Sequence, residues 1–386
     1  MYILVINCGS SSAKYQLFDV ARKVSLARGV VERIGQADSS LRHEKDGHSI
    51  YHSKITCRDH HAAIKIIVDT LSGSHGVIES KSEICGIGHR VVHGGEEFKE
   101  STLITDKVVR SIKKYSELAP LHNPPSLSGI LACSAILKGI RQVAVFDTSF
   151  HQTMPEHAFM YGLPFDYYKR LGIRKYGFHG TSHRFVSEEA ARILKRPIKK
   201  LKLVTCHLGN GCSMTAVDGG KSIDTSMGFT PLEGLLMGTR SGDLDPAVVL
   251  YILEKENLSL NYANDLLNKN SGLLGISGVG NDMRDILKGA RSKGQEARRC
   301  KLAIEMFVYR IKKYVGAYFA AMGNIDAVVI TAGIGENNPW LIKRLKRELG
   351  NVVPKKTKFL VIPTNEELLI AQDTYKVIKG RKNGTT

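Results

Sequence analysis

The pattern of apolar and polar residues predicts two similar strand–turn–strand units. An apolar run at residues 2–6 is followed by small and polar residues at 7–12 and by a second apolar-rich stretch at 14–20. This order is typical of a strand, a tight Gly/Ser turn and an antiparallel strand. Residues 201–217 repeat it around Gly209 and Gly211. The repetition suggests an internal duplication and favours an α/β protein.

Further short apolar runs and helical periodicities predict the remaining elements. Buried strands are expected at residues 85–92, 142–146 and 327–331. Asp59 is a suitable N-cap and Gly73 a suitable end for a helix over 59–71, and Gly323 ends a long amphipathic helix over 298–322. Helices are also expected at 126–138, after a loop at 121–125, and at 365–378.

Composition and charge exclude several classes of protein. The 386 residues suggest two or three domains, and 42% hydrophobic residues exclude wholesale disorder. No apolar run reaches the roughly 18 residues of a membrane helix, and because the opening residues have no basic region or cleavage site we expect no secretory signal. The seven cysteines form no Cys-x-x-Cys motif and indicate reduced thiols in a cytoplasmic protein.

The net charge of +18 raises the question of nucleic-acid binding. The basic stretches are short and dispersed and lack interleaved aromatic residues, since the single Trp is Trp340. We therefore expect neither a nucleic-acid nor a membrane partner. A positive field would still attract phosphate-bearing substrates.

Glycine-rich turns after strands are the main candidate ligand-binding motifs. They lie at residues 7–12, 209–211 and 333–337, and exposed backbone N–H groups in such turns can converge on a phosphate. Thr215 stands where a Walker A loop ending at Ser222 needs its first glycine, and the third glycine of a Rossmann fingerprint is missing. The pairs His89/His93 and His179/His183 lack the glutamate of a zinc hydrolase motif.

Single charged residues at the ends of elements are the candidate catalytic groups. They are Arg90, His122, Asp147, His179 and Arg240. Asp147 ends a predicted strand and Arg240 lies in a glycine-flanked loop, which are positions where functional residues gather.

Taken in order, these segments resemble the family of acetate and propionate kinases. The matching blocks run from residue 3 to about residue 374 and include residues 7–14, 88–95, 121–124, 146–151, 176–184, 207–213, 237–246, 282–284, 331–337 and 363–367. The chain departs from the family at Cys8 and Ala13, and its segment between residues 337 and 363 is shorter than the family pattern.

The resemblance implies the fold of actin, sugar kinases and chaperone ATPases. This fold has two ribonuclease H-like α/β domains with a nucleotide cleft between them. We expect an N-terminal domain at 1–149, joined by a C-terminal helix at 367–386, and a second domain at 150–366. The family also implies a homodimer.

The resemblance implies reversible transfer of a phosphoryl group from ATP to acetate, giving ADP and acetyl phosphate, with Mg²⁺ or alternatively Mn²⁺. Asp147, His179, Arg240 and His122 are then catalytic, and Asp147 is either an acid/base or a group that orients Arg90. Acetate would contact Arg90, Val92, Leu121, Phe178 and Pro231, and the metal would involve Asn7 and Glu366. The nucleotide would contact Ser10, Ser12, Lys14, His207, Leu208, Gly209, Asn210, Gly211, Asp282, Met283, Arg284, Gly333, Ile334, Gly335, Glu336 and Asn337.

Two alternatives remain open from the sequence. A propionate or other short-chain fatty acid kinase shares the same motifs, although Val92 suits acetate better than a smaller residue would. A non-catalytic actin-like ATP-binding protein has no need of a clamp for a carboxylate substrate.

Overall fold

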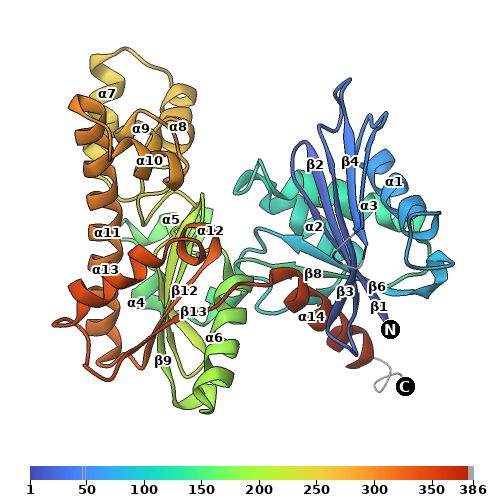
Figure 1. The fold of residues 1–386 in the computed structure, drawn as a ribbon. Helices are drawn as coiled ribbons and strands as arrows, with labels where there is room; N and C mark the ends of the chain where they lie inside the picture. The colour runs from blue at the N-terminus through green and yellow to red at the C-terminus, as the bar shows by residue number, and fades with distance from the viewer. Residues whose placement is uncertain (46, 48, 381–386) are drawn as a thin grey trace. The chain divides into compact units, whose positions relative to one another are not determined.

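The computed structural model describes residues 1–45, 47 and 49–380 (Figure 1). The chain divides into two compact units, each built on its own β-sheet. Unit 1 comprises Met1–Phe150 together with the C-terminal residues from Asn365, and unit 2 comprises His151–Thr364.

Unit 1 contains an eight-stranded sheet of order β5-β4-β3-β2-β1-β6-β8-β7. Strands β1 to β5 pair antiparallel with their sequence neighbours, whereas β6 and β8 continue the sheet parallel to β1. The strands are β1 (Tyr2–Cys8), β2 (Ser12–Asp19), β3 (Val24–Glu32), β4 (Ser40–Lys45), β5 (Ser49–Lys54), β6 (Ile84–Val91), β7 (Thr102–Leu103) and β8 (Gln142–Phe146).

Alternating residues of β1 build the two hydrophobic layers of unit 1. Leu4 and Ile6 pack toward α1 (His60–Ser72) and α3 (Asn123–Ile136). Ile3 and Val5 pack on the other face with residues of α14 (Glu366–Gly380). Because side chains of a strand alternate between faces, one central strand anchors helices on both sides. Helix α2 (Asp106–Lys114) packs against α3.

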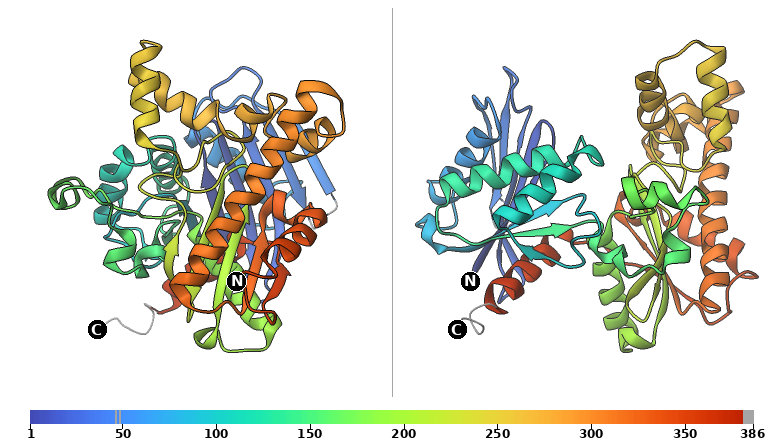
Figure 2. Two further views of the ribbon diagram at one scale, coloured as in Figure 1. Left: turned by 90° about the vertical axis from the view of Figure 1, so that its left-hand side faces the viewer. Right: turned by 180° about the vertical axis from the view of Figure 1, so that it is seen from behind.

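Unit 2 contains a five-stranded sheet of order β11-β10-β9-β12-β13. These strands are β9 (Lys202–Leu208), β10 (Cys212–Asp218), β11 (Lys221–Thr225), β12 (Ala327–Thr331) and β13 (Lys358–Val361). Helix α6 (Gly180–Leu194) lies on one face and α11 (Gly294–Met322) on the other (Figure 2). The other helices are α4 (Glu156–Phe159), α5 (Phe165–Leu171), α7 (Pro246–Lys255), α8 (Leu260–Lys269), α9 (Gly272–Ser277), α10 (Met283–Gly289), α12 (Ala332–Glu336) and α13 (Pro339–Leu349).

The two sheets repeat one topology, as the sequence predicts. In unit 1 the order β3-β2-β1-β6-β8 combines two antiparallel and two parallel pairings. In unit 2 the order β11-β10-β9-β12-β13 has the same sequence of pairings. Both units therefore place a Gly-containing turn between their first two strands.

Several predicted boundaries are confirmed by local geometry. The Asp59 side chain accepts a hydrogen bond from the Ala62 amide and caps α1, and Gly73 follows its end. Gly323, with φ of 71°, ends α11 in the left-handed conformation that glycine tolerates. Strand β12 has the predicted bounds.

Two predicted loops are wrong in part. The segment at 121–125 is predicted as a loop, yet α3 begins at Asn123 because prolines fit the first helical turn, whose N–H groups need no helical partner. The segment at 333–337 is predicted as a phosphate loop, yet residues 332–336 form the short helix α12. The Glu336 carboxylate accepts the Ala332 amide at 2.7 Å and so closes this turn on itself.

No helix in the described part of the chain is both long and apolar enough to cross a membrane. The predicted C-terminal helix at 367–386 corresponds to α14 as far as Gly380, and residues 381–386 lie outside the described residues.

Candidate active site

In unit 1, Arg90 is held by carboxylates from two other elements. Its Nε lies 3.0 and 3.2 Å from the two Asp147 oxygens, and its Nη2 lies 2.7 Å from Oδ2. The same Nη2 lies 3.6 Å from Oε2 of Glu366. Arg90 belongs to β6, Asp147 follows β8 and Glu366 begins α14. The parallel pairing of β6 with β8 brings the first two groups to one edge of the sheet.

The electrostatics of Arg90 follow from this geometry. Burial lowers the pKa of its guanidinium, but Asp147 and Glu366 outweigh burial, so the pKa lies above its ordinary value. The Asp147 side chain is 2% exposed, whereas that of Arg90 is 23% exposed. Arg90 thus remains a permanent cation with part of its surface open to a ligand.

The predicted phosphate turn of unit 1 is a tight hairpin. The Gly9 amide donates to the Ser12 carbonyl at 2.8 Å, and the Gly9 carbonyl is 2.8 Å from Nε2 of His60. Ser10 is exposed at the tip of this turn. Next to the turn, Lys14 stands opposite Asn7 in the β1–β2 register.

Asn7 and Lys14 line a cavity of about 440 Å³ in unit 1. Glu367 also lines it, one residue beyond Glu366. Amide and carboxylate oxygens are the donors that Mg²⁺ prefers, and this ion usually keeps several waters and takes only one or two protein carboxylates. Among the described residues no cluster of three or more His, Cys, Asp or Glu could hold a metal ion. Asn7 and Glu366 carry the amide and carboxylate oxygens that such an ion prefers.

In unit 2, three predicted segments meet at Gly211. A Cβ added at Gly211 would lie 3.4 Å from Nη1 of Arg240 and 3.5 Å from Nε2 of His179. Gly211 belongs to the β9–β10 turn, whereas His179 precedes α6 in a left-handed conformation with φ of 55°. A non-glycine residue held in this region costs about 1–3 kcal/mol, and such strain gathers at functional sites.

The Arg240 side chain differs from Arg90 in its partners. Nη1 of Arg240 donates to the Pro231 carbonyl at 3.1 Å. Throughout the described chain, no carboxylate forms an ion pair with Arg240. Burial lowers the pKa of its guanidinium. A partly buried cation beside a glycine turn, with no counter-charge of its own, is suited to bind an anion.

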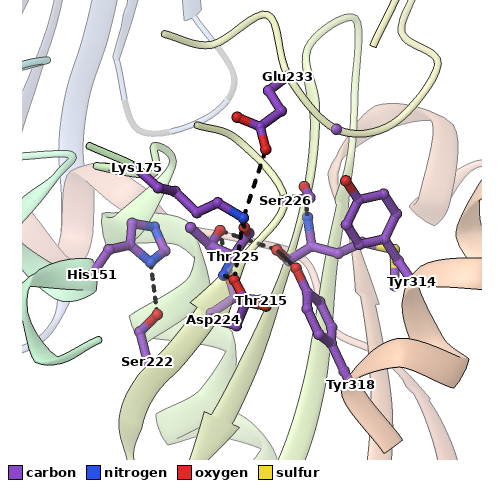
Figure 3. Close-up of polar contacts among 12 residues, drawn as sticks. His151, Lys175, Thr215, Ser222, Asp224, Thr225, Ser226, Glu233, Tyr314 and Tyr318 are labelled. Atoms are coloured by element: carbon purple, nitrogen blue, oxygen red, sulfur yellow. Dashed lines mark hydrogen bonds and ion pairs between the residues drawn. The ribbon is translucent and has the colours of Figure 1, made fainter. Parts of the chain in front are cut away.

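The loop that carries Arg240 is anchored by a polar network at its base (Figure 3). Nζ of Lys175 lies 3.7 Å from Oε1 of Glu233 and 3.4 Å from Oδ1 of Asp224. Tyr314 of α11 donates to Asp243 at 2.8 Å. The Gly238 amide donates to the Asn210 carbonyl at 2.9 Å, which ties the same loop to the β9–β10 turn.

A cavity of about 680 Å³ in unit 2 joins three of the predicted nucleotide segments. Asp282 and Arg284 pair with each other at its rim, and this hydrogen bonding lowers the pKa of Asp282 to about 2. The cavity is lined by Gly209, Asn210, Asn281, Asp282, Met283, Arg284, Gly333, Ile334, Asn337 and Asn338. The sequence reasoning missed Asn281 and Asn338, although each adjoins a predicted motif.

Other predicted residues lie in more varied surroundings. Gly335 and Leu208 are packed in the interior, and Glu336 bonds its own helix turn, and none of these three residues lines the 680 Å³ cavity. His207 is 9% exposed and stacks on His179 with ring centroids 4.1 Å apart. His122 occupies the N-cap position of α3.

The four predicted acyl-pocket residues are divided between the units. Val92 and Leu121 belong to unit 1, and Leu121 is 64% exposed. Phe178 and Pro231 belong to unit 2, and Phe178 is 2% exposed. Val92 follows β6 and is two residues from Arg90.

Two α/β units of one topology, each with a Gly-containing turn after its first strand, define the actin-like ATPase fold. The model of the acetokinase family matches residues 2–353. The acetate kinase of Halothermothrix orenii is 52% identical over 400 aligned positions, covering 98% of this chain and all of the relative. That of Caldicellulosiruptor saccharolyticus is 51% identical over 402 positions, with 98% and 100% coverage.

Solved structures agree with this assignment. The acetate kinase of Porphyromonas gingivalis superposes with a TM-score of 0.93 at 42% identity, covering 98% of this chain and 99% of that one. A propionate kinase of Francisella tularensis gives 0.89 at 41% identity, with 97% and 99% coverage. The chain therefore belongs to the acetokinase family, and it is a kinase whose phosphoryl acceptor is a carboxyl group.

Proposed function

We propose that the protein catalyses the reversible, Mg²⁺-dependent transfer of the γ-phosphoryl group of ATP to acetate, giving ADP and acetyl phosphate. The observation that carries this proposal is the meeting of His179 and Arg240 at the Gly211 turn. Relatives named acetate kinase at 51–52% identity favour acetate over propionate as the acceptor.

The phosphoryl group would be stabilised by residues of unit 2. In-line transfer spreads negative charge over the equatorial oxygens, and fixed cationic donors lower the barrier most when they are already in place. Arg240 and the Nε2 edge of His179 flank the turn where these oxygens would lie. His207 supports the His179 ring by stacking, and we assign His122 a supporting donor role.

The carboxylate of acetate would be bound by Arg90. The Nε and Nη2 groups of Arg90 already bond Asp147, so acetate would contact the remaining Nη1 edge. Acetate is ionised at neutral pH and needs no base before it attacks phosphorus. We therefore assign Asp147 the role of orienting Arg90, and we place the methyl group of acetate beside Val92, with Leu121, Phe178 and Pro231 as further contacts.

The nucleotide and its metal complete the site. The 680 Å³ cavity of unit 2 is large enough for an adenosine moiety, and Ser10, Ser12 and Lys14 of unit 1 would contact the phosphates. Asn7 and Glu366 would hold Mg²⁺, largely through water. The bound ion would neutralise charge on the β- and γ-phosphates.

A hydroxamate assay tests the proposal directly. Purified protein is incubated with ATP, Mg²⁺ and acetate, propionate or butyrate, and acyl phosphate is trapped with hydroxylamine. We expect acetate to give the highest kcat/KM and propionate to give a lower, measurable value. A higher kcat/KM for propionate would make the protein a propionate kinase, and no acyl phosphate from any acid would refute the proposal.

We also propose that the protein forms a homodimer through α7, α8 and α11 of unit 2. Exposed apolar residues on or beside these helices are Leu244, Val248, Leu250, Tyr251, Leu260, Tyr262, Leu302 and Tyr309. A second copy is the simplest cover for so many apolar side chains. Light scattering coupled to size exclusion checks the mass, and Leu250→Asp is expected to shift it toward the monomer.

A cytoplasmic location completes the proposal. All seven cysteines are free thiols, and six of them are buried. Proteins of reducing compartments keep their cysteines in this form.

A further inference from the structure

Histidines and hydroxyl groups form a continuous chain beneath His179 in unit 2. The Ser213 hydroxyl lies 2.9 Å from Nδ1 of His179 and 2.7 Å from Nε2 of His183. On the far side of the His183 ring, Nδ1 lies 2.7 Å from Oγ1 of Thr205. That hydroxyl reaches the Thr215 carbonyl at 3.4 Å. From the sequence, His183 is notable only for its spacing from His179, and this pair lacks the glutamate of a zinc hydrolase motif.

Burial fixes the charge of the inner histidine. His183, Ser213 and Thr205 are each 0% exposed. Burial lowers the pKa of His183 well below its ordinary value, and the neighbouring His151 and His207 lower it further. His183 is therefore neutral and carries one ring proton.

The proton count then determines the direction of the chain. A serine hydroxyl donates one hydrogen bond, so Ser213 can donate to only one of the two histidines. If Nδ1 of His179 carries a proton, Ser213 accepts from it and donates to Nε2 of His183. His183 must then donate from Nδ1 to Thr205, which donates to the Thr215 carbonyl. Every donor in this arrangement has an acceptor.

The reverse direction suits only a neutral His179. In that arrangement Ser213 donates to Nδ1 of His179, which must be unprotonated. A positively charged His179 carries protons on both nitrogens and is compatible only with the first arrangement. Its second proton, on Nε2, then lies on the edge that faces Gly211 and Arg240.

We propose that Ser213 and His183 are positioning residues that hold His179 as an imidazolium with Nε2–H directed at the transferring phosphoryl group. The inference rests on the proposed role of His179. In this arrangement His179 supplies a charged donor, which forms a stronger hydrogen bond than a neutral one.

The charges around His179 make its protonation depend on the nucleotide. The titratable and charged groups near it in the described structure include His207 on β9, His183 on α6, reached through Ser213, and Arg240 from the loop. A bound phosphate adds negative charge beside these groups, so we expect the imidazolium to be more stable in the nucleotide complex than in the free protein.

Two buried serines give a matched test. Ser213 bonds both His179 and His183. Ser222 instead bonds Nδ1 of His151, which is not part of this series of hydrogen bonds (Figure 3). Both side chains are 0% exposed. We expect Ser213→Ala to lower kcat about tenfold or more at pH 8, since losing a hydrogen bond to a charged group costs about that much. The basic limb of its kcat–pH profile should move down by about one pH unit, and the KM for ATP should stay within about twofold.

The control and rescue variants separate positioning from packing. Ser222→Ala should leave the pH limb unchanged. His183→Gln can accept from Ser213 and donate to Thr205, so it should retain more activity than His183→Leu. Equal losses in the two serine variants, or a loss in Ser213→Ala without a shifted limb, would overturn the inference. His183→Gln decides the matter if Ser213→Ala does not fold, because activity no better than that of His183→Leu also overturns it.

His179→Asn distinguishes this inference from the proposed function. If His179→Asn keeps full activity, the proposed role of His179 is wrong. If His179→Asn is impaired while Ser213→Ala matches the wild type in activity and pH profile, only the positioning inference fails.

Discussion

The two arginines among the candidate site residues, one in each unit, have different electrostatic surroundings. Arg90 in unit 1 is paired with Asp147 at 2.7 Å and with Glu366 at 3.6 Å. Arg240 in unit 2 donates to the Pro231 carbonyl and, in the described chain, forms no ion pair. Both guanidinium groups are charged, but the charge of Arg90 is balanced by carboxylates, whereas that of Arg240 has no such partner in the described chain.

This difference matches the charges of the two proposed ligands. Acetate carries one negative charge, so an arginine that binds it must be oriented well but need not attract strongly. The triphosphate carries several charges, which can balance an unpaired cation when they bind. A paired arginine therefore serves orientation, and an unpaired arginine serves charge stabilisation.

The largest expected effect is that of Arg240→Ala. We expect kcat to fall by at least about a hundredfold, because a preorganised donor to the transition state is removed. The KM for ATP should change little, since the ground state loses less than the transition state. Steady-state kinetics check this, with Arg344→Ala as a control for loss of a partly buried arginine that is paired with carboxylates. A normal kcat with a raised KM would make Arg240 a nucleotide-binding residue.

A second prediction concerns the buried histidines of both units. Burial lowers the pKa of His89 in unit 1 and of His151 in unit 2 to about 4. The unfolded chain, with histidine pKa values of about 6.5, binds more protons between these values, so stability is complete above pH 6.5 and declines as the pH falls toward 4. Each histidine should cost about 2 kcal/mol at pH 5, or about 30-fold in the unfolding equilibrium.

Urea unfolding at pH 7, 6 and 5 measures this loss. His89→Gln and His151→Gln should each make stability less dependent on pH. If only one variant does so, the loss of stability in acid arises in the unit that contains that histidine, and the two units differ in acid sensitivity. An unchanged pH dependence in both variants would contradict the prediction.

The sequence predicts the repeated scaffold well, because local patterns of apolar residues and helix caps specify its strands and helices. Strands β1 and β12 are mostly apolar runs, and α1 and α11 have a capping Asp59 and a terminal Gly323. The prediction is poorer where a side chain bonds the backbone of its own turn and changes the local conformation. Glu336 closes its own turn and converts an expected loop into α12.

The sequence predicts which residues belong to the candidate site, but it does not predict which of them contact one another. Arg90 and Asp147 are 57 positions apart, and no local signal joins them. Ser213 lies within a predicted strand, and its role depends on α6 packing above the same sheet face. Partners of this kind become visible only when the sheet order is known.

A third prediction tests whether Asp147 orients Arg90. Asp147→Asn keeps a hydrogen-bond acceptor but removes the charge that fixes the guanidinium. We expect kcat to fall by about tenfold, the size of a hydrogen bond to a charged group. The requirement for Mg²⁺ should change, because the Arg90 cation is no longer balanced beside Glu366, and the shape of the pH–rate profile should not. A shifted acidic limb with unchanged Mg²⁺ dependence would instead make Asp147 an acid/base.

The smallest effect is expected for a substitution at Val92, in unit 1 near the paired Arg90. Val92 lies two residues from Arg90, just after β6, and is partly exposed. Val92→Ala should make room for one more carbon beside the acyl group. One methylene in an apolar pocket changes discrimination by about 1–3 kcal/mol at most. We therefore expect the propionate-to-acetate ratio of kcat/KM to rise several-fold, mainly through KM, because the change affects binding rather than the phosphoryl centre.

Measuring both acids with both proteins decides this last prediction. Because Arg240 and His179 are untouched, kcat with acetate should remain within about twofold of the wild type. Leu131→Ala, on the exposed surface of α3, is a control for loss of apolar volume away from the site. If the ratio does not move, Val92 does not contact the acyl group. A lower kcat with both acids would mean that Val92 supports Arg90 instead, and that the orienting side of the site extends beyond the two carboxylates.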